Sequence, residues 1–138
     1  MTDNKMQAWE WLIAKDGRFL KCDAIDHAEG GDGVGPQDVA WDVAGAAFEL
    51  ELDEREVMFV IDRVMRQPDQ HALAKKLPTY LLFYLGFRAG ELARAARTAP
   101  PADRARLDAA LARARRAFRN AIESERPVQA LQTGGVAP

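Results

Sequence analysis

The sequence predicts a mainly α-helical α+β protein, in which a short N-terminal β-hairpin packs on a bundle of about four helices. Asp16-Gly17 lies between two short apolar runs, and this dipeptide supplies the positive φ angles that a tight hairpin turn needs. Beyond Pro36, four segments carry apolar residues at helical spacing. With 138 residues, 48% of them hydrophobic, the chain can form one compact domain with a core.

Composition narrows the class of protein. Charged residues make up 29% of the chain, which is ordinary for a folded domain in water. The single cysteine, Cys22, permits neither an internal disulfide nor a cysteine-based zinc site. The first residues lack the pattern of a secretory signal, and the longest near-apolar run, Leu77 to Phe87, is too short to cross a bilayer. We therefore expect a cytoplasmic protein with no membrane association.

The hairpin is expected over residues 9–25. If Asp16 and Gly17 are the two turn residues, Glu10 lies opposite Asp23 across the strands. Like charges in that position repel each other, and a magnesium ion would turn the repulsion into attraction because carboxylate oxygens suit it. In the alternative, the strands fray there and both carboxylates reach water, and the pairing alone favours this alternative. The same register places Trp11 opposite Cys22 and Ile13 opposite Leu20.

The rest of the chain is expected to be helical. Residues 26–35 form a glycine-rich loop without the Lys-Ser or Lys-Thr of a phosphate-binding loop. Asp53 and Glu56 fit a capping box at a helix start, Pro100-Pro101 separates the last two helices, and residues 127–138 should be a disordered tail. We expect a single domain over residues 1–126, with helices at about 36–50, 53–67, 78–97 and 103–125.

Two of these helices have a clear inner face, and the last also has a basic outer face. In the third helix the inner row comprises the largely apolar residues Leu81, Tyr84, Leu85 and Leu92 together with Arg88. In the last helix it comprises Leu107, Leu111, Ala114, Phe118 and Ile122.

Charge is unevenly divided along the sequence. Residues 1–87 hold 9 Lys and Arg against 16 Asp and Glu, a net −7, whereas residues 88–138 hold 10 against 5, a net +5. A basic half can indicate nucleic-acid binding. Here the arginines lie opposite an apolar stripe, as on any solvated helix face, so the pattern does not favour a nucleic-acid partner. The arginines concerned are Arg104, Arg106, Arg113, Arg115, Arg116 and Arg119.

Several motifs occur in an order that resembles a known family. An aspartate after a strand, Asp23, is followed by a glycine-containing loop and by Gly-Pro-Gln-Asp-Val-Ala-Trp-Asp-Val-Ala-Gly at residues 35–45. Thr-Tyr-Leu-Leu-Phe-Tyr-Leu-Gly-Phe-Arg-Ala-Gly follows at residues 79–90. Together, over about residues 9–97, these motifs resemble the second half of the aminoglycoside/choline phosphotransferase-like branch of the protein-kinase-like fold. The resemblance implies the C-terminal lobe of an ATP-dependent phosphotransferase that acts on a small molecule.

The resemblance also implies roles for individual residues. Asp23 matches the metal-binding aspartate, Glu10 stands where a second metal ligand would lie, and Asp3 stands where the catalytic base would be. The chain departs from the family here, because no histidine lies two residues before Asp3 and Ala8 occupies the position of the catalytic-loop asparagine.

Two further residues are assigned structural roles. Asp42 matches a buried aspartate that accepts hydrogen bonds from the catalytic-loop backbone in kinase-like folds. Its alternative is a solvated acidic stripe shared with Asp38, one turn earlier. Arg88 lies in an otherwise apolar helix and needs an acidic partner if it is buried.

Two functional hypotheses follow. In the first, the chain is the C-terminal lobe of a phosphotransferase that is inactive alone, because the glycine-rich nucleotide lobe is missing. Mg²⁺ and ATP would then bind only in a complete parent enzyme, and no cofactor is expected for this chain alone. In the second, the chain is a non-catalytic helical module. Its exposed face, including Trp9 and Trp11, would bind the missing N-terminal lobe, another protein partner or a second copy.

Overall fold

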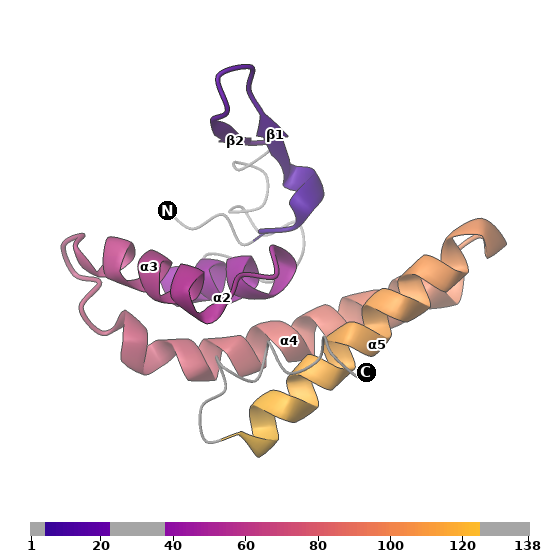
Figure 1. Cartoon of the computed structure of the whole chain (residues 1–138). Helices are drawn as coiled ribbons and strands as arrows, with labels where there is room; N and C mark the ends of the chain where they lie inside the picture. Colours follow the sequence, from indigo (N-terminus) through magenta and orange to yellow (C-terminus); the bar gives the residue numbers. More distant parts are fainter. Residues whose placement is uncertain (1–4, 23–37, 125–138) are drawn as a thin grey trace. The chain divides into compact units, whose positions relative to one another are not determined.

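The computed structural model describes residues 5–22 and 38–124. Two compact units make up the chain, Met1–Leu77 and Pro78–Pro138. The described residues contain four α-helices and one two-stranded antiparallel sheet (Figure 1). The expected mainly helical α+β class is therefore confirmed. The predicted loop at 26–35 and tail at 127–138 lie outside the described residues.

The hairpin is shorter than predicted and its register differs by one residue. A 3₁₀ helix, Ala8–Glu10, leads into β1, Trp11–Ile13, which pairs with β2, Phe19–Lys21. The pairs are Trp11 with Lys21, Leu12 with Leu20, and Ile13 with Phe19.

The turn explains this register. The Ala14 N–H donates to the Arg18 carbonyl at 2.8 Å, so three residues form the loop instead of two. Only the last of them, Gly17, has a positive φ, at +83°, which suits a three-residue loop with glycine in the left-handed region. The Cys22 N–H donates to the Glu10 carbonyl at 2.7 Å. The predicted pairing of Glu10 with Asp23 is therefore wrong, because Glu10 faces Cys22.

Helices α2, Val39–Glu49, and α3, Glu54–Met65, contact each other in the first unit. Most residues of α2 are buried, and many of them are small. Short side chains allow neighbouring elements to approach a helix closely. The predicted capping box of α3 is confirmed. The Asp53 carboxylate accepts from the Glu56 N–H at 2.8 Å, and the Glu56 carboxylate accepts from the Asp53 N–H at 2.8 Å.

Helix α4 spans Leu73–Thr98 and begins earlier than predicted, with Pro78 inside it. Proline lacks an N–H, so the usual hydrogen bond from residue 78 to the Ala74 carbonyl cannot form. The boundary between the two compact units lies at this proline. The row predicted to face inward is buried along its whole length, which confirms the helical period read from the sequence: Leu81, Tyr84, Leu85, Arg88 and Leu92.

Helix α5, Pro101–Glu123, returns alongside the C-terminal part of α4 (Figure 1). A Cβ added at Gly86 of α4 would lie 3.5 Å from the Phe118 ring, so these two helices contact each other there. The predicted inner stripe of α5 is wrong at Ile122, which is 61% exposed. The buried residues of α5 are alanines, Ala114, Ala117 and Ala121. At 100° per residue, Ile122 lies roughly 80° from Ala114, at the margin of that face.

Among the helices described, none combines the length and the hydropathy that crossing a bilayer requires.

Candidate functional site

Only Glu10 of the predicted catalytic and metal-binding residues is described, because Asp3 and Asp23 lie outside the described ranges. The Glu10 carboxylate lies 3.6 Å from the Lys21 ammonium. The same ammonium lies 5.9 Å from the centre of the Trp11 ring, within the range of a cation–π contact. Residues 5–22 and 38–124 contain no group of three His, Cys, Asp or Glu side chains able to hold a metal, and the predicted metal role of Glu10 with Asp23 stays a prediction.

The two predicted structural residues are both described. Arg88 is buried, and its guanidinium lies 3.4 Å from the Glu91 carboxylate, one turn later on α4. This contact meets the expectation that a buried Arg88 has an acidic partner. Asp42 is half-buried on α2, whose other residues are mostly buried. Both interpretations of Asp42 therefore stay open.

The sequence reasoning missed an ion pair in the first unit. Asp38 is the N-cap of α2, and its side chain accepts from the Ala40 N–H at 3.0 Å. It also accepts from the Lys76 ammonium. The hydrogen bond from Lys76, and then that from Ala40, hold the pKa of Asp38 below its ordinary value of 3.8. An aspartate before a small-residue helix is a cap signal, but the helix had been expected to begin at Pro36.

Large apolar side chains of the hairpin reach solvent instead of a core. We define the hairpin surface as the five side chains that are 44% to 71% exposed: Trp9, Leu12, Ile13, Phe19 and Leu20. Residues directly opposite each other share a face of a sheet. Ile13 and Phe19 therefore lie on one face of the hairpin, and Leu12 and Leu20 on the other.

Both faces of this hairpin are thus apolar, whereas a hairpin with one side in water normally alternates apolar and polar residues. Of the six strand residues, only Lys21 is charged, and its ammonium lies beside Glu10 and Trp11. An isolated two-stranded hairpin is marginally stable in water.

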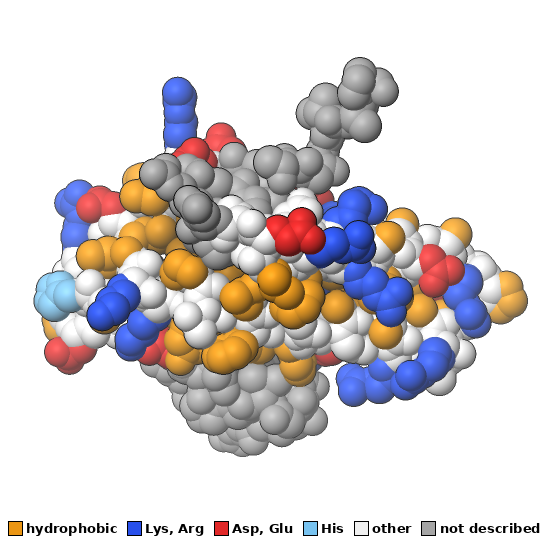
Figure 2. Space-filling model, turned by 90° about the horizontal axis from the view of Figure 1, so that it is seen from below, with side chains coloured by type: hydrophobic (Ala, Val, Ile, Leu, Met, Phe, Trp, Pro, Cys, Tyr) orange, Lys and Arg blue, Asp and Glu red, His pale blue; other side chains and the backbone are white. Residues whose placement is uncertain are grey.

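The second unit has a different surface. On the face drawn in Figure 2, basic side chains gather toward the α4–α5 end, and these are arginines because residues 78–138 contain no lysine. Exposed arginines of α5 include Arg104, Arg115 and Arg119, which share one side of the helix at 3.6 residues per turn. Such a surface resembles the solvated face expected from the sequence.

No protein-family model, curated protein or solved structure matches this chain.

Proposed function

We propose that the chain is a non-catalytic binding module that recognises a protein partner through the hairpin surface. The observation that supports this most directly is the exposure of Ile13 and Phe19, 71% and 67% exposed on the same face of the hairpin. Contiguous exposed apolar residues on soluble proteins mark interaction sites more often than chance. Aromatic residues such as Phe19 and Trp9 are also enriched at the centres of protein interfaces.

The hairpin turn has the conformation and hydrogen bonds expected of a stable turn. Its apolar side chains are therefore not exposed because the turn is poorly formed. Gly17 takes the positive φ that the turn requires. The Asp16 carboxylate accepts from the Arg18 guanidinium at 2.8 Å and from the Arg18 N–H at 3.2 Å. The hairpin thus combines a well-formed turn with strands that are apolar on both faces. We expect this combination in a hairpin whose surface a partner covers.

The phosphotransferase activity that the sequence resemblance implies stays a prediction. If the chain is the C-terminal lobe of such an enzyme, the hairpin surface is where the nucleotide-binding lobe would dock. The binding proposal and this prediction therefore share a surface, and they differ in whether Mg²⁺ and ATP bind through Asp23 and Glu10.

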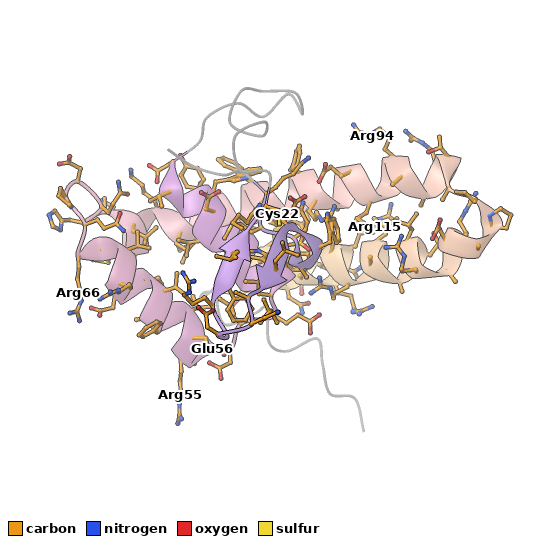
Figure 3. The ribbon with its side chains drawn as sticks, turned by 90° about the horizontal axis from the view of Figure 1, so that it is seen from above. Cys22, Arg55, Glu56, Arg66, Arg94 and Arg115 are labelled. Atoms are coloured by element: carbon orange, nitrogen blue, oxygen red, sulfur yellow. The ribbon has the colours of Figure 1, made fainter. Side chains whose placement is uncertain are left out.

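Site-specific photocrosslinking in the cells that express the protein tests the binding proposal. Phe19→p-benzoylphenylalanine should give a discrete adduct on illumination, because the ring reaches solvent. Arg55 is the matched control, since it is exposed and projects from α3 (Figure 3). Mass spectrometry of the adduct identifies the partner. Equal crosslinking from the two positions, or none from residue 19, would contradict the proposal.

Calorimetric titration with Mg²⁺ and ATP tests the phosphotransferase prediction in the positive direction only, since a C-terminal lobe without its parent enzyme is also expected not to bind them. We expect no magnesium-dependent ATP binding by the chain alone. If such binding is found, is lost in Asp23→Asn and survives in Asp16→Asn, the phosphotransferase prediction replaces the binding module. Asp16 is a suitable control because it lies in the hairpin turn, where Arg18 is its partner.

A further inference from the structure

We propose that the partner of the hairpin surface is a second copy of this chain, paired antiparallel through the outer edge of β2. This inference rests on the proposed binding function and narrows it to one occupant. Two hairpins joined in this way form a four-stranded sheet, and three or more strands are what a sheet needs to be stable in water.

The observed register shows which backbone groups point outward. Cys22 pairs with Glu10 by a hydrogen bond, and Ala14 pairs with Arg18 in the same way. Hydrogen-bonded and non-hydrogen-bonded pairs alternate along an antiparallel ladder. The pair of Ile13 with Phe19 is therefore non-hydrogen-bonded, and the N–H and C=O of Phe19 point away from β1.

The two edges of the hairpin are not equivalent. On β1, the Trp11 N–H already donates to the Ala8 carbonyl of the 3₁₀ helix, so the edge is closed at its first residue. On β2, the outward N–H and C=O of Phe19 can pair with those of Phe19 in a second copy. A two-fold axis at this residue gives two equivalent hydrogen bonds, which is how a self-complementary interface is built.

Charges along β2 permit this pairing. With Phe19 opposite Phe19 of the second copy, Arg18 lies opposite Leu20 and Lys21 lies opposite Gly17, so no like charges face each other directly. Residues 8–22 carry three basic and two acidic side chains, so two copies repel each other weakly. Edge strands that must stay unpaired are usually guarded by outward charges. Phe19, the first residue of β2, carries none, and the nearest charges are those of Arg18 and Lys21.

The exposed area indicates how strong the dimer should be. Aromatic side chains bury roughly 150–250 Å² each, and transfer energies correspond to roughly 60–120 Å² for an aliphatic side chain. From the exposed fractions, the whole hairpin surface amounts to roughly 300–540 Å² per chain, and pairing through the β2 edge covers only part of it because β1 lies one strand away from the interface. A standard interface buries about 800 Å² per partner. We therefore expect a dimer that dissociates on dilution.

Sedimentation equilibrium of the full chain over a wide concentration range tests the dimer. The wild type should pass from monomer to dimer as concentration rises. Phe19→Pro removes the outward N–H without breaking a hydrogen bond inside the hairpin, and it should weaken dimerisation at least ten-fold. Ile13→Pro is the matched control, because it removes an outward N–H from the β1 edge, and it should change the dissociation constant less than three-fold.

Disulfide trapping gives a second test that does not depend on proline. In a Cys22→Ser background, Phe19→Cys should form a disulfide-linked dimer on mild oxidation, because directly opposite hydrogen-bonded residues have Cα atoms about 5.5 Å apart, within the range of a disulfide. Ile13→Cys lies two strands from its counterpart across the two-fold axis and should stay monomeric.

A wild type that is monomeric at all concentrations overturns the inference, as does equal weakening by Phe19→Pro and Ile13→Pro together with equal trapping at both positions. If residue 19 then still crosslinks to a different protein in cells, the binding module stands and only the second copy is wrong. If no crosslink forms, the proposed function fails as well.

Discussion

The β-hairpin and helix α5 use apolar residues in opposite ways. The hairpin presents large side chains such as Ile13 and Phe19 to solvent. In α5 the buried residues are small, Ala114, Ala117 and Ala121, and arginines occupy the outside. Both segments have sound local signals, a turn glycine in one and Pro101 at the first helical position in the other.

The difference shows that local structure and burial are separate requirements. The buried residues of α5 are alanines, and α5 contacts α4 where Gly86 lies beside the Phe118 ring. The hairpin forms the correct turn but leaves its apolar surface uncovered by the described residues of the first unit. We therefore expect the hairpin to need a partner for its stability, and we expect α5 to be stable without one.

The largest expected effect compares two leucines. Leu85 of α4 is fully buried, and Leu12 of β1 is 58% exposed. Leu85→Ala should lower the free energy of unfolding by about 2–5 kcal/mol, because it leaves a cavity in the core. Leu12→Ala should lower it by less than about 0.5 kcal/mol. Urea unfolding followed by helical circular dichroism, at a concentration where the chain is monomeric, checks both values.

The same two variants can also contradict the conclusion that the hairpin surface is uncovered. A cost for Leu12→Ala in the monomer as large as that for Leu85→Ala would mean that the hairpin is covered within a single chain. The hairpin surface would then be part of the core, and the binding proposal would lose its main support.

A smaller effect is expected at the cap of α2. Asp38→Ala removes the acceptor for the Ala40 N–H and the partner of Lys76, and should cost about 0.5–2 kcal/mol. The pKa of Asp38 is lowered in the folded state by those same hydrogen bonds. Its ionised form therefore stabilises the fold above the ordinary pKa of 3.8, and this contribution disappears as pH falls through the lower, folded-state pKa.

Asp38→Asn separates the cap from the charge, since asparagine caps helices about as well as aspartate. The wild type should be more stable than Asp38→Asn at pH values well above the ordinary aspartate pKa. The difference should shrink as the solution is acidified toward and below the folded-state pKa. A difference that is constant with pH in urea unfolding would show that the ion pair with Lys76 contributes nothing to stability.

Sequence reasoning predicted the elements better than their exact register. The capping box at Asp53 and the buried row of α4 could be predicted, because each depends on spacing within one helix. The hairpin register could not, since Asp16-Gly17 fits both a two-residue and a three-residue loop, and a shift of one residue moves Glu10 from Asp23 to Cys22. Ile122 was placed inside because hydropathy alone does not show that alanines set the distance between helices.

The candidate site was harder to predict than the fold. One acidic partner of Arg88 lies one turn away, at Glu91, and the sequence offers several other acidic residues that fit the expectation equally well. The hairpin surface is exposed because no other described segment covers it, and a local sequence pattern cannot predict which segments will pack together. Asp3 and Asp23 lie outside the described residues, so their predicted roles are still predictions.

The smallest expected effect concerns Trp11. Its indole Nε1 is buried, and among the described residues it has no hydrogen-bond acceptor. A buried polar group without a partner destabilises a protein by about 1–3 kcal/mol. Trp11→Phe removes that donor together with part of the ring that contacts Lys21. The two contributions oppose each other, so the free energy of unfolding should change by less than about 1 kcal/mol.

Trp11→Leu is the useful second variant, because it removes both the donor and the aromatic contact with the Lys21 ammonium. If Trp11→Phe is neutral and Trp11→Leu is destabilising in urea unfolding, the ring stabilises the hairpin and the Nε1 does not. A loss of more than about 2 kcal/mol in Trp11→Phe would mean that the indole N–H has an acceptor in solution. In that case the first residue of β1 would be held by a side-chain hydrogen bond as well as by the contact of its ring with Lys21.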